Sequence, residues 1–446
     1  MKHSILILMV FLSGFAANVS AQKLPELLNA KLVRWTSPED ENVSRYFIVG
    51  GTTESGSYSS KVYEVLIGES TEFICKEMRN IPEGSKVLAA MPARINKTEI
   101  FSALLISERH VFDNAIQLFW GDDKSVEIER EIAPREEFMG LTEIRPGVSV
   151  LFGGVDSTNT VSDRIWTFDE VSRTYTQLPY SLPQGGRYGC TTFNTGTHTF
   201  ALGGRGADHS INGTPLVLDH SNPYLTWDVP SVEGFLPSFI ADPLGAQFGS
   251  TMFVAGGKGY VYTKGGGDQE QISTQLYRIT ATGTALRGEI IAIDFPPLFG
   301  GVAFVDTLGG DTVFYAIAGA SEITQEGKVI ASKNVFRYKI KAQTIEKFDT
   351  TSNAWVSAIV SARDRAYDFP EELTIAPLPA EDVFSIEMPE GHTAESLMIF
   401  NSNGLLVRSV KNPYLNDISS EGLPKGAYIL RVVSGEKVFF GKLIKL

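Results

Sequence analysis

Polar residues recur at matching positions along this chain, each on or next to a strand expected to begin one unit of a repeat. They are Arg34, Lys86, Glu137, Arg187, Tyr188, Asp242 and Asp306. Arg34 and Arg187 can clamp a carboxylate, because each guanidinium offers a planar fork of donors. Glu137 and Asp242 can act as general acid and base if they face each other across a channel with separated pKa values. The alternative is that these side chains only solvate the wall of a wet channel.

Other chemistry-bearing residues form no assembled metal or cofactor site. The six histidines are scattered, without the i, i+4 or cysteine-partnered spacing of a zinc site. Cys190 lies near Tyr188, but a copper radical site of the galactose-oxidase type also needs two histidines at the same mouth. Asp156–Asp163 is rich in oxygen ligands for calcium, yet it lacks the glycine and closing glutamate of an EF-hand loop. We predict no metal and no cofactor.

Charge and cysteine usage narrow the partners. The formal net charge of −13 argues against a nucleic-acid partner, because proteins that bind phosphate backbones carry clustered basic faces. Anionic membrane surfaces are disfavoured for the same reason. The chain has two cysteines, Cys75 and Cys190. The repeat places them on an outer and an inner strand three units apart, so we predict that they stay unpaired.

The first 21 residues have the pattern of a secretory signal peptide. Lys2 and His3 precede an apolar run, and Val19-Ser20-Ala21 offers small residues for cleavage. The apolar run is too short to span a bilayer comfortably, and no later stretch reaches eighteen apolar residues. We therefore predict an exported chain with no transmembrane segment.

The strands that would position the candidate residues are marked by glycine doublets. Apolar runs end at Gly50-Gly51, Gly153-Gly154, Gly203-Gly204 and Gly256-Gly257, and more weakly at Gly319. The doublets recur about every fifty residues, and residues 100–106 fill the one double-length gap without glycines. A period of this length is typical of propeller blades. Six units starting near residues 31, 86, 137, 187, 239 and 301 then predict a six-bladed β-propeller within residues 22–369.

Each unit reads as four short strands, with an aromatic residue on the third. These residues are Tyr63, Trp120, Trp166, Tyr277 and Tyr338. The apolar run that ends in Gly-Gly, followed by an aromatic-containing strand, resembles a kelch repeat over residues 30–350, and Gly186-Arg187-Tyr188-Gly189 resembles the arginine-containing inner strand of that family. The resemblance implies the propeller fold. It leaves function open, because kelch propellers include enzymes, glycan binders and scaffolds.

The chain beyond the repeat divides into a proline-containing linker at 370–380 and a small β-sandwich at 381–446. The small β-sandwich contains a series of short motifs in a fixed order: Phe400-Asn401, Asn403-Gly404, the Asp-Ile-Ser stretch at 417–419, Leu423-Pro424 and the Lys-Leu-Ile-Lys ending. It resembles the C-terminal sorting domain of type IX secretion substrates in Bacteroidetes. The resemblance implies that the type IX machinery recognises residues 381–446 and that the product is secreted or held on the outer surface. The alternative is a small immunoglobulin-like binding module.

Three functions fit this organisation. The first is a binding module for a glycan or a surface protein, which the charged channel mouth and the lack of a catalytic motif favour. The second is a carbohydrate-processing enzyme such as a sialic-acid mutarotase, which the kelch resemblance permits; Arg34, Arg187 and Glu137 would be its working groups. The third is a scaffold of the cell envelope. A structure distinguishes them by showing whether two arginines and a carboxylate converge on one pocket.

Overall fold

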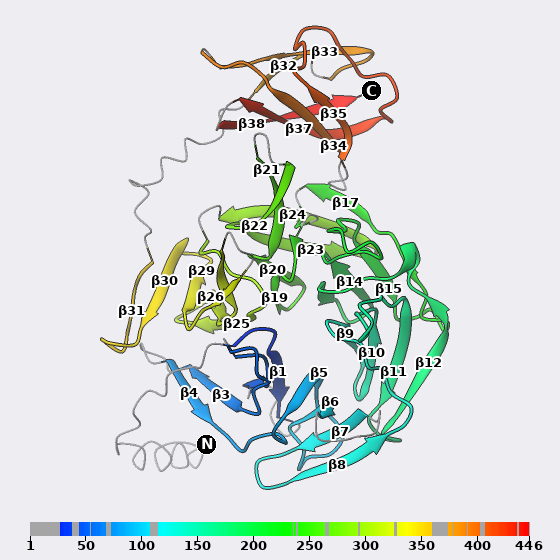
Figure 1. Cartoon of the computed structure of the whole chain (residues 1–446), viewed down its shortest axis with the longest axis vertical. Coiled ribbons are helices and arrows are strands. Elements are labelled where there is room, and N and C mark those ends of the chain that lie inside the picture. Colours follow the sequence, from blue (N-terminus) through cyan, green and yellow to red (C-terminus); the bar gives the residue numbers. More distant parts are fainter. Residues whose placement is uncertain are drawn as a thin grey trace, which may run out of the picture.

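The structure is a computed structural model, and Figure 1 shows its β-strands arranged as a ring followed by a smaller β region. It describes residues 27–358 and 373–445, apart from internal gaps at 38–43, 54, 68–72, 108–114, 235, 238–239, 264–266, 293–294, 325–327, 378, 390, 402–405 and 435–436. The predicted signal peptide therefore lies outside the described residues. Residues 359–369, which the sequence analysis included in the propeller, lie outside them too.

Six antiparallel sheets of at least four strands form the blades. Blade 1 contains β1 (Lys31–Thr36), β2 (Ser44–Val49), β3 (Val62–Ile67) and β4 (Phe73–Glu77). Blade 2 contains β5 (Ser85–Pro92), β6 (Phe101–Ser107), β7 (Ala115–Trp120) and β8 (Ser125–Arg130). Blade 3 contains β9 (Gly140–Arg145), β10 (Val148–Phe152), β11 (Arg164–Asp169) and β12 (Thr174–Ser181).

The second half repeats the plan with additions. Blade 4 contains β13 (Thr191–Asn194), β14 (His198–Leu202), β15 (Leu216–Asp219) and β16 (Trp227–Asp228). Blade 5 contains β19 (Leu244–Phe248), β20 (Thr251–Ala255), β23 (Leu276–Thr282) and β24 (Ala285–Ala292), and β17 (Ser231–Gly234) pairs with β24 in parallel. Blade 6 contains β25 (Val302–Leu308), β26 (Asp311–Ile317), β29 (Val335–Lys339), β30 (Thr344–Asp349) and β31 (Ala354–Ser357). The all-β, six-bladed architecture predicted from the sequence is confirmed.

Short extra sheets extend the long connections of the last two blades. In blade 5, β21 (Lys258–Thr263) pairs with β22 (Gly267–Ile272) and with β18 (Ile240–Ala241). In blade 6, β27 (Ala320–Ile323) pairs with β28 (Val329–Ala331). A 3-10 turn, η1 (Pro183–Gly185), precedes blade 4. These additions account for the longer repeats in this half of the chain.

The two ends of the ring differ in their connections. We call the end where the innermost strands begin the loop end, because the long loops between second and third strands lie there. We call the opposite end the turn end, because tight hairpins join first and second strands there, as at Gly147 and Gly196.

The glycine doublets place left-handed backbone at the loop end. Both glycines of each doublet have positive φ, for example 67° at Gly203 and 93° at Gly204. A Cβ atom on Gly203 would lie 2.3 Å from the carbonyl oxygen of Ile240, where the chain enters the next blade. The amide of Gly204 donates to that same oxygen at 2.8 Å. Only glycine combines this conformation with so close an approach of two backbones. In blade 6 the first position is Ala318, whose φ of 57° keeps the left-handed geometry.

A chain of backbone hydrogen bonds links the residues that lead into the innermost strands. The amide of Asn29 donates to Gly300, that of Gly300 to Asp242, that of Asp242 to Gly189 and that of Gly189 to Phe138, over 2.7–3.1 Å. All five residues have φ between 53° and 64°. The repeated conformation turns each chain segment from the rim into the ring, so five blades share one geometry at the loop end.

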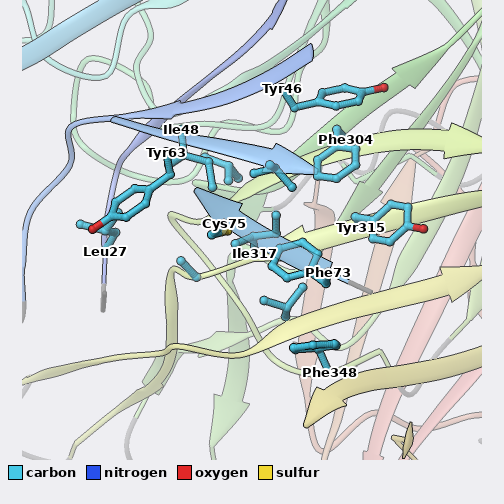
Figure 2. Close-up of a cluster of buried hydrophobic side chains, with 14 of the residues drawn as sticks. Leu27, Tyr46, Ile48, Tyr63, Phe73, Cys75, Phe304, Tyr315, Ile317 and Phe348 are labelled. Atoms are coloured by element: carbon cyan, nitrogen blue, oxygen red, sulfur yellow. The ribbon is translucent and has the colours of Figure 1, made fainter. Parts of the chain in front are cut away.

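Blades 1 and 6 close the ring through hydrogen bonds and a shared core. The amide of Gly319 donates to the carbonyl oxygen of Leu27 at 2.8 Å. Figure 2 shows Tyr46 of blade 1 beside Phe304 of blade 6, and their rings stack with centroids 4.3 Å apart. Phe304 stacks in turn on Tyr315 at 4.9 Å. Because residues from both ends of the repeat bury one another, closure protects sheet edges that an open array would expose.

The aromatic residues of the third strands wedge between blades, as predicted. Tyr63, Trp120, Trp166, Tyr277 and Tyr338 are all buried. In blade 2, where the sequence has no glycine doublet, the Trp120 ring lies 5.8 Å from that of Phe47 in blade 1, centroid to centroid, and stacks on Phe101 of its own blade at 4.9 Å. Burial of large rings between sheets stabilises the packing of neighbouring blades.

The C-terminal region is a small β-sandwich. One sheet contains β32 (Thr374–Ala376), β33 (Val383–Glu387) and β36 (Ile418–Ser419). The other contains β34 (Ser396–Asn401), β35 (Leu406–Lys411), β37 (Gly426–Ser434) and β38 (Lys437–Lys445). Phe384 from the first sheet and Leu430 from the second share its core. Strand β32 falls within the segment predicted as a linker, so the paired β-structure begins a few residues earlier than expected.

Candidate functional site

The central channel between the innermost strands contains a cavity of about 270 Å³. Every blade contributes to its wall, and representative lining residues are Leu32, Leu88, Met139, Cys190, Pro243 and Val302. Among the described residues that line the cavity, Lys31 alone carries a charge. The side chains that line the cavity are therefore mostly apolar, whereas the sequence suggested polar ones. Four of the charged candidates, Lys86, Glu137, Arg187 and Asp242, lie at or just before the start of an innermost strand and therefore at the loop end of the channel.

Two ion pairs lie at this mouth. Lys86, at the start of blade 2, forms an ion pair with Glu137, which leads into blade 3. Its Nζ atom also lies 5.0 Å from the centroid of the Tyr58 ring of blade 1. Glu137 is one of the two acids proposed from the sequence as a catalytic pair, and it is already engaged by this lysine. The pair holds three neighbouring blades together around the mouth.

The second ion pair repeats this arrangement in the other half of the ring. Lys258 of β21 lies 2.9 Å from the carboxylate of Asp242, and 4.8 Å from the centroid of the Phe299 ring before blade 6. Both acidic candidates therefore have a lysine partner, and both lysines lie over an aromatic ring. Cation–π contacts of this kind are worth about 0.5–1 kcal/mol at exposed sites.

Aromatic and imidazole groups complete the mouth between these ion pairs. The hydroxyl of Tyr188 lies 3.0 Å from Nδ1 of His209, and the rings of Tyr188 and Phe138 lie 6.4 Å apart. Tyr58, Phe138 and Tyr188 are all partly exposed. The loop between β14 and β15 supplies His209, which sequence analysis did not select. The sequence signal that could have identified His209 is its position in the loop after the Gly203-Gly204 doublet, because the residues before the innermost strand of the same blade, such as Tyr188, contact that loop.

Arg187 lies at the same end but inside the wall. Its side chain is 1% exposed, and Nη1 donates to the carbonyl oxygen of Gly203 over 3.4 Å. Its Nε atom is buried without a hydrogen-bond partner among the described residues. Burial lowers the pKa of this guanidinium, and the nearby Cys190 thiol acts weakly in the opposite direction. Arg187 therefore does not reach the mouth as a clamp for a partner.

The two remaining candidates lie towards the turn end. Arg34 is exposed, and its Nη2 atom lies 3.4 Å from the Ser44 hydroxyl. Asp306 accepts the amide of Thr307, next to its own strand position, at 2.8 Å. Both act electrostatically on Tyr46, whose pKa burial raises to about 12. The structure thus does not bring Arg34, Arg187 and Glu137 into one pocket, the arrangement on which the mutarotase hypothesis depended.

Lys31 is a second residue that sequence reasoning missed. Burial lowers the pKa of its ammonium, while the carboxylates of Asp242 and Glu137 raise it. The only sequence signal for it is a lysine at the start of β1. The other blades have small or apolar residues near the corresponding innermost position. That signal emerges once the inner strands are aligned with one another by their structural positions.

Metal-binding geometry is not found among the described residues. Within them, no three histidine, cysteine, aspartate or glutamate side chains are grouped as a metal site requires. Asp156, in the loop considered for calcium, accepts the Thr158 hydroxyl at 2.7 Å and the Thr160 amide at 2.9 Å. Its carboxylate therefore organises its own turn. Cys75 and Cys190 are both free thiols, as predicted.

The fold and the C-terminal sandwich define an exported propeller protein with a sorting tail. Residues 374–446 match the family described as the secretion system C-terminal sorting domain. This family implies recognition by the type IX secretion machinery, and it indicates secretion or attachment to the outer surface. Within the described part of the chain, no helix has the length and apolar character needed to cross a membrane.

The ring is similar to a solved structure, that of YjhT. The two share 13% sequence identity with a TM-score of 0.50, over 73% of this chain and 99% of that chain. At this identity the likeness concerns the fold, and it agrees with the kelch-like propeller expected from the glycine doublets. No curated protein matches the chain.

Proposed function

We propose that the loop end of the propeller is a binding surface for an extracellular glycan. The observation that carries this proposal is the group of partly exposed rings, Tyr58, Phe138 and Tyr188, beside two lysine–carboxylate pairs. Aromatic faces pack on the apolar faces of sugar rings, and charged groups at their edges bind hydroxyls. A protein partner that inserts an extended segment into the same mouth is the second possibility.

The sorting domain supports this proposal, because it indicates secretion or attachment to the outer surface, where glycans are exposed. The placement of the arginines supports binding over sugar turnover. A pocket that distorts a sugar needs groups aimed at the reacting atoms, whereas Arg187 is buried and Arg34 lies towards the other end.

The test compares two tyrosines on the full exported chain. Tyr188→Ala removes a ring from the mouth, and Tyr224→Ala removes one that is 61% exposed on the outer part of blade 4. On an array of bacterial and host glycans, we expect Tyr188→Ala to weaken binding at least about tenfold, equivalent to roughly 1.4 kcal/mol. Tyr224→Ala should bind as the unmodified chain does.

The same variants separate the possible outcomes. Equal loss in both variants would show that the mouth is not the binding surface. If no glycan binds but the chain captures a defined outer-surface protein, and Tyr188→Ala abolishes capture, the protein partner replaces the glycan.

A further inference from the structure

The cavity inside the propeller is lined mainly by apolar side chains and contains one cation, Lys31, without a bonded partner among the described residues. Lys31 lines the cavity, and among the described residues its ammonium has no hydrogen-bond or ion-pair partner. Its electrostatic neighbours are Asp242 of blade 5 and Glu137 of blade 3. A side chain from blade 1 that interacts with carboxylates on two blades across the ring extends towards the channel axis.

Those carboxylates do not neutralise Lys31, because each already has its own lysine. Glu137 pairs with Lys86 and Asp242 pairs with Lys258. Around the loop end of the cavity, three lysines therefore face two carboxylates, and Lys31 is the lysine without a carboxylate of its own. A partly buried ammonium without a bonded partner is costly unless another group stabilises it.

A second unpaired cation lies directly behind the wall. Arg187 is 1% exposed, and no carboxylate among the described residues pairs with it. It interacts electrostatically with Cys190, which lines the cavity. Burial raises the pKa of the Cys190 thiol to about 11, so this thiol is neutral near pH 7 and supplies no counter-charge. Two basic groups without a carboxylate partner therefore adjoin the cavity, Lys31 in its wall and Arg187 behind it.

We propose that the channel binds a small free monocarboxylate. Its carboxylate lies against the ammonium of Lys31, and its short apolar body packs on Leu88, Met139 and Leu141. The ammonium supplies a charge-assisted hydrogen bond, which is about twice as strong as a neutral one. This site lies behind the mouth and does not rest on the glycan proposed above.

The cavity selects the class of ligand by size and polarity. A volume of about 270 Å³ equals the share of roughly nine liquid waters, which suits an acid with a few carbon atoms. Neutral molecules would leave the positive charge unsatisfied. Besides Lys31 and backbone groups, the lining side chains offer as donors the Thr191 hydroxyl and the Cys190 thiol, which are too few for the further oxygens of a polyanion.

The experiment titrates the full exported chain with butyrate and, separately, with butyramide, its neutral counterpart of the same shape. Binding is followed by calorimetry and by saturation transfer to the ligand methyl protons. We expect saturable binding of butyrate, and binding of butyramide at least roughly tenfold weaker, because the amide lacks the charge that pairs with Lys31.

Two lysine variants of blade 1 identify the residue responsible. Lys31→Met keeps the length of the side chain without its charge, and we expect it to weaken butyrate binding at least roughly tenfold. Lys76→Met, at an exposed position on the outer strand β4, is the matched control and should bind like the unmodified chain. Lys31→Arg, which retains a cation, should retain measurable binding.

Three results would overturn the proposal. The first is equal affinity for butyrate and butyramide. The second is unchanged butyrate affinity in Lys31→Met. The third is no saturable butyrate binding by the unmodified chain. Because Lys31→Arg and the thermal unfolding of each variant are measured together, loss of fold is distinguished from loss of the counter-charge. Glycan binding at the mouth can persist or fail independently of each result.

Discussion

The loop end and the turn end of the propeller are built from the same strands, yet they carry different features. At the turn end, short hairpins such as 146–147 and 195–197 join neighbouring strands. At the loop end, connections such as 203–215 and 256–275 carry the doublets, and the segments that lead into the innermost strands carry the backbone hydrogen-bond chain and both carboxylates of the ion pairs. Tight turns leave no room for variation, whereas long loops anchored by a fixed backbone can present different side chains. The loop end therefore holds both the rigid frame and the groups available for binding.

The largest contrast should appear when one glycine at each end of blade 4 is replaced. Gly203 at the loop end and Gly196 at the turn end both have positive φ, but a Cβ on Gly196 meets nothing within 4 Å. We expect Gly203→Ala to lower the free energy of unfolding by about 3 kcal/mol or more, from strain plus the clash with Ile240. Gly196→Ala should cost about 1 kcal/mol.

Denaturant unfolding of the two variants measures this difference directly. Equal costs would mean that the loop end relaxes as easily as an exposed hairpin, and the distinction between frame and turn would be lost.

An intermediate effect is expected at the two arginines that the sequence grouped together. Arg187 is buried with an unpaired Nε atom, whereas Arg34 is exposed. Replacing a buried, uncompensated charge with an apolar residue of similar length removes a desolvation cost. We expect Arg187→Met to raise the free energy of unfolding by about 1 kcal/mol or more, and Arg34→Met to change it by less than about 0.5 kcal/mol.

Chemical denaturation measures both values, and butyrate affinity should fall in Arg187→Met alone. A marked loss of stability in that variant would show that the Arg187 side chain is needed for packing, and that its buried charge does not destabilise the folded chain.

The smallest effect is a pH dependence at the turn end. His220 bonds the carbonyl of Gly196 through Nδ1 at 3.1 Å and the Thr199 hydroxyl through Nε2 at 2.8 Å. Burial lowers the pKa of this imidazole in the folded chain. Just below the ordinary histidine pKa of about 6.5, the unfolded chain therefore binds more protons than the folded chain. The free energy of unfolding then decreases as the pH is lowered through that window.

Unfolding midpoints measured from pH 7.5 down to pH 5 should show a decrease that His220→Gln reduces. The same slope in both proteins would assign the dependence to other groups.

The glycine doublets were sufficient to predict the blades, because left-handed backbone beside a neighbouring chain admits glycine and little else. They also placed the ring's missing copy near residue 103, where blade 2 lies. Alternation of apolar residues gave the strand order, and the aromatic wedges followed from it.

The site was less predictable. Lys86 was recognisable as a polar residue near a channel, but its contacts with Glu137 and Tyr58 depend on how three blades meet. The sequence did not determine whether Arg187 points to the mouth or into the wall, because this depends on the backbone conformation of the segment before β13. Lys31 resembled any surface lysine until the inner strands were placed around a common axis.

The contact between Leu27 and Gly319 also bears on the order of events during synthesis. Leu27 precedes blade 1 and its partner Gly319 lies in blade 6, so this hydrogen bond requires that all six blades have been synthesised. A chain that stops earlier cannot close the ring. The sorting domain begins at residue 374, after the last closing contact. Only a polypeptide long enough to contain the whole ring also contains the sorting domain, and truncated products lack this domain.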